Sequence, residues 1–368
     1  MLKPDTHAAR LARLRSEMAV ADLDAVAIVP GANQQYLLGS HFHLMERPTV
    51  LLVPREGELR MVLPVLEEPS WTALGIAART HLWQDSTGYA SAFEAALADL
   101  GARRIGVEGQ RMRVFESLAI RSHSNAELVD AQRPIAAMRL SKDDDEITLL
   151  EEAIRQSEAG LKATLAEVRV GMSEREVNTI LLSALFSAGG EGLSFPAIVV
   201  AGPQSALPHA AAGDYRIAPG DALLFDFGVT FGGYNADITR TVFVGDPSEE
   251  ARALYETVRE ANALGRDMAR AGLTAHALDD AVTAHLEASR FASYVLHKTG
   301  HGLGLDVHED PYVMRGNHTP FAVGHVITIE PGLYMPGLRG VRIEDDVVIT
   351  ETGCRSLTQF PRDLMVVG

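Results

Sequence analysis

Four acidic residues interrupt apolar segments in the C-terminal half of the chain. They are Asp226 in LLFDFG, Asp237 in YNADITRTVFV, Glu330 in VITIEPG and Glu344 in GVRIEDDVVIT. Acidic residues are almost never buried unless they are paired or bind a metal. His301, flanked by glycines in TGHGLGLDVH, is a fifth candidate. Because converging carboxylates repel one another and burial raises their pKa values, a pair of divalent cations would remove both penalties.

Buried salt bridges are the structural alternative to a metal site. Arg240, Arg339 and Arg342 are the basic residues close to these acids in the sequence. Not every acid therefore has an obvious partner. An edge strand or an arginine partner explains any single acid, but the four acids and the histidine together favour a metal site.

The ligand set predicts the metal and the chemistry. Four carboxylates and one imidazole favour Mn(II) and tolerate Co(II), Fe(II) or Zn(II). The one cysteine of the chain, Cys354, lies outside this set. Two ions about 3.5–4 Å apart can share a bridging water, lower its pKa and polarise a carbonyl group. We therefore predict two divalent metal ions per subunit and hydrolysis of an amide bond.

The segments that carry these residues resemble the pita-bread metallopeptidases, specifically the Xaa-Pro branch of prolidase and aminopeptidase P. The resemblance rests on PHAAAGDYRIAPGDALLFDFGVTFGGYNADITRTV, TGHGLGLDVHEDP, ITIEPGLYMPG and GVRIEDDVVIT, in the family's order within residues 208–350. It implies that Asp226 binds one metal, that Asp237 and Glu344 bridge the two metals, and that His301 and Glu330 complete the other.

The resemblance also implies roles in catalysis and in substrate binding. Glu330 would take a proton from the water molecule that bridges the two metals. His209, in LPHAA, and His308, in DVHED, match two non-ligand histidines that bind substrate and stabilise the tetrahedral intermediate. Arg342 resembles an arginine that orients a ligand carboxylate, and we group it with the substrate-binding residues. Taken alone, each histidine is more typical of a surface histidine or of one that is hydrogen-bonded within the fold. The alternative for Arg342 is a plain surface arginine.

The ligand set does not decide how long the substrate is. A prolidase must recognise the carboxylate that follows proline, and arginine suits this task. Many prolidases carry an arginine shortly after the second histidine, but this chain reads EDPY at residues 309–312. Arg47, in GSHFHLMERP, is the substitute candidate, and its alternative is a loop arginine paired with Glu46 or with solvent.

We therefore predict a prolidase that cleaves dipeptides with proline at the second position. Aminopeptidase P, which releases the first residue of longer Xaa-Pro peptides, is the alternative. A metal-free binding protein or a creatinase-type hydrolase is a remote third possibility, because all five ligand positions are filled. The resemblance also implies a homodimer.

The first third of the chain is typical of a small α/β domain. Residues 7–20 have the apolar spacing of a helix, and residues 24–29, 49–54, 59–65 and 102–109 predict short strands. Residues 33–48 are expected to be rich in loops. We predict an N-terminal creatinase-like α/β domain over residues 1–135.

For the rest of the chain, the resemblance implies a pita-bread α+β catalytic domain over residues 136–368. Ser141 and Ser173 are expected to cap two helices. Two further helices are predicted near residues 248–271 and 275–289. Strand-rich segments follow each helix pair, so the order of elements suggests an internal duplication.

Charge and composition exclude some partners. The chain has 33 basic and 49 acidic residues, a formal net charge of −16. Nucleic acid and anionic membranes both need a basic face, so neither is an expected partner.

One cysteine cannot form a disulfide within the chain, which fits a reducing compartment. With no apolar signal segment expected at the N-terminus, we predict a cytoplasmic protein.

Overall fold

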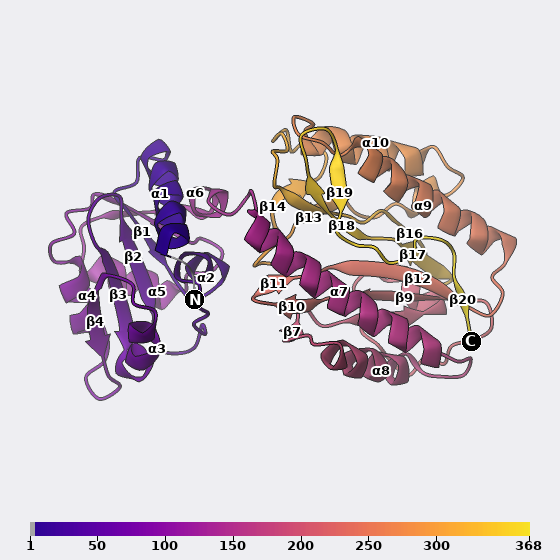
Figure 1. Ribbon diagram of the computed structural model, residues 1–368, viewed down its shortest axis with the longest axis horizontal. Helices are drawn as coiled ribbons and strands as arrows, with labels where there is room; N and C mark the ends of the chain where they lie inside the picture. The colour runs from indigo at the N-terminus through magenta and orange to yellow at the C-terminus, as the bar shows by residue number, and fades with distance from the viewer. Residues whose placement is uncertain (1–3) are drawn as a thin grey trace. The chain divides into compact units, whose positions relative to one another are not determined.

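The computed structural model describes residues 4–368. These residues form two compact units, one that ends at Arg139 and one that spans Leu140–Gly368 (Figure 1). A small α/β unit followed by a larger α+β unit is the architecture that the sequence predicted. The domain ranges 1–135 and 136–368 stay a prediction.

The first unit contains a six-stranded sheet in the order β4-β3-β2-β1-β5-β6. The strands are β1 (Ala25–Ile28), β2 (Val50–Pro54), β3 (Leu59–Pro64), β4 (Ala78–Trp83), β5 (Arg104–Val107) and β6 (Glu127–Asp130). The helices are α1 (Pro4–Val20), α2 (Ala32–Leu38), α3 (Glu68–Ala73), α4 (Ala90–Leu97), α5 (Val114–Ser122) and α6 (Gln132–Ala137). Strands β1, β2 and β3 are buried at every position, as in a sheet covered on both faces.

The expectation of a loop-rich segment over residues 33–48 is wrong in its first part. Residues Ala32–Leu38 form α2, which begins after Gly31 and ends at Gly39 in the left-handed conformation. Tyr36, Leu37 and Leu38 are buried there. A helix of two turns is too short to show a helical period in the sequence, and its burial against the rest of the unit stabilises it.

The second unit has four helices of eight residues or more, and they occur as two pairs. The helices are α7 (Asp144–Glu167), α8 (Glu174–Ser187), α9 (Glu249–Met268) and α10 (Ala275–Glu287). Strands β7 (Gly192–Leu193), β8 (Ile198–Ala201), β9 (Asp221–Phe227), β10 (Val229–Phe231), β11 (Tyr234–Asn235) and β12 (Ile238–Val244) follow the first pair. Strands β13 (Gly300–Gly302), β14 (Glu309–Val313), β15 (Val326–Ile329), β16 (Gly332–Met335), β17 (Arg339–Arg342), β18 (Asp345–Ile349), β19 (Cys354–Ser356) and β20 (Val366–Val367) follow the second. The predicted repeat of helix pair and strands is confirmed.

The strands of the second unit lie between the two helix pairs (Figure 1). One core cluster joins α7 and α8 to Leu223, Phe225 and Phe227 of β9. A second core cluster joins α9 and α10 to Ala222 of the same strand. Because successive side chains on a strand point to opposite faces, β9 packs against both cores.

The helix starts follow from capping residues. Ser173 caps α8 and Ser248 caps α9, each with its side chain on a backbone N–H of the first turn. The predicted cap at Ser141 is wrong: Asp143 caps α7 in a reciprocal capping box with Glu146. Asp143 competes successfully because its carboxylate also suits the positive end of the helix dipole.

Across residues 4–368, no helix combines the length and the apolar composition that crossing a membrane requires.

Candidate metal centre and catalytic cavity

The five predicted ligands come from two sheets of the second unit. Asp226 lies within β9, and Asp237 directly precedes β12, its antiparallel neighbour. His301 is the central residue of β13, Glu330 directly follows β15, and Glu344 directly precedes β18. Only Asp226 and His301 are therefore inside strands. The others lie at strand ends, where a polar side chain can turn toward the site.

The structure brings all five side chains together. Three overlapping groups have ligand atoms within 4.8 Å of one another: Asp226 with Asp237 and Glu344, His301 with Glu330 and Glu344, and Asp237 with His301 and His308. Glu344 belongs to the first two groups, and Asp237 to the first and the third. This sharing is the arrangement expected of carboxylates that bridge two ions.

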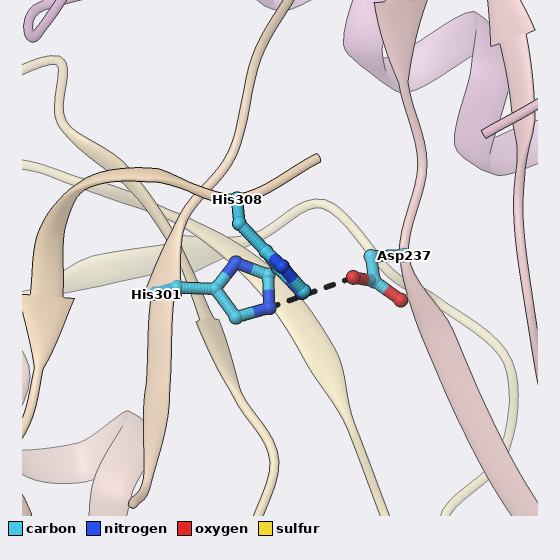
Figure 2. A group of neighbouring side chains, drawn as sticks. All are labelled: Asp237, His301 and His308. Carbon is cyan, nitrogen blue, oxygen red and sulfur yellow. Dashed lines mark ion pairs between the residues drawn. The ribbon is translucent and has the colours of Figure 1, made fainter. Parts of the chain in front are cut away.

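The ring of His301 is oriented toward the carboxylates. Its Nδ1 lies 3.0 Å from the carbonyl oxygen of Gly302, and its Nε2 lies 3.4 Å from Glu330 Oε1 and 3.6 Å from Asp237 Oδ2. Burial lowers the pKa of His301 to about 3. The imidazole is therefore neutral near pH 7, with Nδ1–H donating to the carbonyl and the Nε2 lone pair facing the carboxylates (Figure 2).

These distances fit atoms that share a cation. Two ligand atoms bound to one ion at tetrahedral angles are about 3.4 Å apart, since each metal–ligand bond is about 2.1 Å. In addition, Asp226 Oδ1 is buried and accepts no hydrogen bond from any residue in the described range 4–368. A buried carboxylate oxygen without a donor is costly unless a cation binds it. The residues therefore fit a pair of divalent metal ions.

Without a cation, the acidic cluster is strained electrostatically. Burial and the charge of Glu344 raise the pKa of Asp237 well above its usual value. Burial and the charge of Glu330 raise the pKa of Glu344 well above its usual value. Burial also raises the pKa of Glu330 to about 7. Bound cations would lower all three pKa values again, so the deprotonated ligands and the metals stabilise one another.

Arg342 and Thr239 donate hydrogen bonds to two of the predicted ligands, Asp226 and Glu344. Arg342 donates hydrogen bonds to Asp226 Oδ2, to the hydroxyl of Tyr334 at 2.6 Å and to the hydroxyl of Thr239 at 3.0 Å. The Thr239 hydroxyl in turn donates to Glu344 Oε2 at 2.7 Å. Of the three arginines considered in the sequence, Arg342 reaches a predicted ligand, whereas Arg240 pairs with Asp345.

A cavity of about 420 Å³ opens over these residues. Its wall includes all five predicted ligands together with His209, His308 and Arg342. His308 packs edge-on against His301, with their ring centroids 4.2 Å apart (Figure 2). The predicted catalytic residues and the predicted ligands thus share one cavity.

Sequence reasoning missed two cavity residues that directly precede the His301 motif. His297 lies 2.7 Å from the hydroxyl of Tyr334 through Nε2, and Lys298 lines the wall beside it. Both stand in HKTGH, three and four residues before His301. Their closeness to a predicted ligand was the signal that could have identified them.

Arg47 belongs to the first unit and is already engaged there. Its guanidinium donates to both carboxylate oxygens of Asp85, at 2.7–3.2 Å, and to Glu46 at 2.6 Å. The alternative that the sequence left open, pairing with Glu46, is present. Two of the five guanidinium N–H donors of Arg47 are not used by these contacts.

Two segments of the chain match known families. Residues 148–351 match metallopeptidase family M24, and residues 10–141 match the creatinase/prolidase N-terminal domain. The chain is 36% identical to the Xaa-Pro dipeptidase of Pyrococcus horikoshii over 265 residues, which cover 72% of this chain and 76% of that protein.

Solved structures resemble the whole chain. An Xaa-Pro dipeptidase from Bacillus anthracis has a TM-score of 0.91 and 29% identity, covering 98% of this chain and 100% of its own. An X-Pro aminopeptidase from Thermotoga maritima has a TM-score of 0.85 and 30% identity, covering 97% of this chain and 99% of its own.

Proposed function

The chain belongs to metallopeptidase family M24, and from this premise we propose that it is a prolidase that cleaves dipeptides with proline at the second position. Membership of the family confirms the resemblance to the pita-bread metallopeptidases. The names of the relatives support an Xaa-Pro substrate. The observation that carries the proposal is the convergence of Asp226, Asp237, His301, Glu330 and Glu344 in one cavity.

The ligands divide between two cations in the proposed site. Asp226 would hold one metal, and His301 and Glu330 would hold the other. Asp237 and Glu344 would bind both, which their membership of two overlapping groups supports. When bound, two divalent cations lower the pKa of a water molecule and polarise the scissile carbonyl group.

Side chains of the cavity supply the remaining chemistry. Glu330, a carboxylate in the wall of the cavity, is suited to take a proton from the attacking water and to pass it on. His209 and His308 would donate hydrogen bonds to the substrate carbonyl as negative charge develops on its oxygen. Arg342 holds Asp226 in place, and its three hydrogen bonds support this orienting role. Proline has no N–H, so the cavity need not supply an acceptor at the leaving nitrogen.

Selectivity for dipeptides requires a cation that binds the carboxylate after proline. We propose that Arg47 contributes to this selectivity through the N–H donors that its contacts with Asp85 and Glu46 do not use. Aminopeptidase P, which has no such requirement, is the second candidate function. The similarity to an X-Pro aminopeptidase supports it.

Hydrolysis of Ala-Pro and of Ala-Pro-Ala by metal-stripped enzyme resupplied with Mn(II) tests the proposal. Arg47→Ala is measured alongside, and Arg103→Ala, an exposed arginine of the same unit, is the matched control. A prolidase prefers the dipeptide, and Arg47→Ala reduces that preference. Equal or faster cleavage of the tripeptide would assign the chain to aminopeptidase P instead. Failure to cleave either peptide would overturn both functions.

Three finer properties are proposed on the same basis. The oxygen-rich ligand set supports Mn(II) as the native metal, and activity after resupply with Mn(II), Co(II), Fe(II) or Zn(II) ranks the alternatives. The family resemblance supports a homodimer, which the molar mass from light scattering tests. One cysteine and the absence of any disulfide requirement support a cytoplasmic location, which cell fractionation tests.

A further inference from the structure

Lys298 is an uncommitted cation in the wall of the catalytic cavity. Two side chains of that wall, Arg342 and Lys298, carry a permanent positive charge. Arg342 donates from all three guanidinium nitrogens to protein acceptors. Lys298, by contrast, makes no ion pair or hydrogen bond through Nζ with any residue that the structure describes, from 4 to 368. Its ammonium group is therefore available to a ligand in the cavity.

The ammonium group lies close to the reacting groups. Lys298 is three residues before His301, and it lines the same cavity as His308 and Glu330. A substrate held between His308 and the predicted ligands would therefore place one end within reach of this lysine.

The position of Lys298 explains a departure in the sequence. The segment after His308 reads EDPY at residues 309–312 and lacks the arginine that many prolidases carry shortly after this histidine. The Nζ of Lys298 lies 5.4 Å from the centroid of the Tyr312 ring, a cation–π distance. Strand β13 pairs antiparallel with β14 through Gly300 and Val313, which brings the residues before Gly300 beside Tyr312. The positive charge that residues 309–312 lack is thus supplied from the neighbouring segment.

We propose that Lys298 binds the terminal carboxylate of the dipeptide substrate and so selects dipeptides over longer peptides. This inference rests on the proposed function. Four ligand carboxylates and two divalent cations balance in formal charge, and Arg342 is committed to Asp226. The substrate carboxylate therefore needs a further cation, and Lys298 provides one without breaking an ion pair or a hydrogen bond. Arg47, by contrast, is already paired with Asp85 and Glu46.

The experiment compares Ala-Pro with Ala-Pro-NH2, which lacks the terminal charge, for wild-type enzyme, Lys298→Met and Lys298→Arg loaded with Mn(II). Lys162→Met, which removes an exposed lysine from α7, is the matched control. One charge-assisted contact corresponds to about a 10- to 100-fold change in kcat/KM. Lys298→Met should lose that factor in kcat/KM on Ala-Pro, mainly through a higher KM. Its loss of kcat/KM on Ala-Pro-NH2 should be at least tenfold smaller. Lys298→Arg should restore part of the loss, and the metal content of all variants should match.

Two results distinguish the ways in which the inference can fail. If wild-type enzyme does not cleave Ala-Pro, the proposed function is wrong and this inference falls with it. If wild-type enzyme cleaves Ala-Pro but Lys298→Met loses equally on both substrates, Lys298 acts through the fold or the oxyanion and the proposed carboxylate contact is wrong.

Discussion

The hydroxyl of Thr239 donates a hydrogen bond to Glu344 Oε2 at 2.7 Å while accepting one from Arg342 Nε at 3.0 Å. Thr239 is fully buried on β12, opposite Asp226 of β9. One small side chain thus links two proposed ligands, because Arg342 also binds Asp226. The orientation of the carboxylates depends on this contact as well as on the strands that carry them.

Thr239→Val tests the contact without changing the volume of the side chain. We expect metal affinity or activity to fall about 10- to 100-fold, because Glu344 loses a donor that fixes its orientation. The measurement is a titration of stripped enzyme with Mn(II), followed by activity. Thr257→Val on α9 removes a hydroxyl that donates to the carbonyl of Ala253, and it should titrate like wild-type enzyme. Unchanged affinity in Thr239→Val would refute the orienting role.

Asp237→Asn should abolish metal loading and activity while the fold persists. The amide keeps the shape of the side chain but cannot bridge two cations as a carboxylate does. Burial and the charge of Glu344 raise the pKa of Asp237, so removing its charge should leave the metal-free protein at least as stable as wild type. Metal analysis and thermal unfolding of the stripped proteins measure both effects. Asp214→Asn, at an exposed carboxylate, is the control. Two metals per chain and normal turnover in Asp237→Asn would contradict the assignment of the site.

Metal removal should reverse the ordinary dependence of stability on pH. Burial raises the pKa of Glu330 to about 7 from the usual 4.5, so in the metal-free protein the folded state binds more protons than the unfolded state between these values. Its stability must therefore fall as the pH rises through that window. We expect the Tm of chelated enzyme to be on the order of 5 °C lower at pH 7.5 than at pH 5.5.

Two comparisons isolate the contribution of Glu330 to this pH effect. Chelated Glu330→Gln should show a smaller difference in Tm, since it has no carboxyl group to titrate at that position. Wild-type enzyme with Mn(II) restored should be more stable at pH 7.5 than the chelated enzyme, because cations favour the deprotonated ligands. A chelated wild-type Tm that rises from pH 5.5 to pH 7.5 would contradict the argument.

The parts of the fold that the sequence predicted depend on local signals. Ser173 caps α8 by a contact within one turn, and the sequence shows both the residue and its spacing from Glu176. The proposed ligands were visible because a carboxylate in an apolar segment is costly, so its presence implies a partner. Asp226 in β9 is the clearest case.

The parts that the sequence did not predict depend on contacts between distant residues. Arg240 was one possible partner for the acids, but it pairs with Asp345, which is 105 positions away, and both are fully buried. Lys298 was overlooked because its role depends on a cavity that several strands form together. The start of α7 was misplaced for a different reason: Ser141 and Asp143 are both good caps, and only the backbone geometry distinguishes them.

His308 provides the sharpest distinction between a ligand and a catalytic residue. Its ring lies within ligand distance of Asp237 and His301, yet the proposed function gives it a hydrogen bond to the substrate. His308→Ala should therefore lower kcat about 100-fold, the effect of removing one oxyanion donor, with metal content unchanged. His318→Ala, at an exposed histidine that packs against His276, is the control and should match wild-type turnover. If His308→Ala instead loses a metal ion in proportion to its activity, His308 is a ligand, and the division of roles between His301 and His308 must be redrawn.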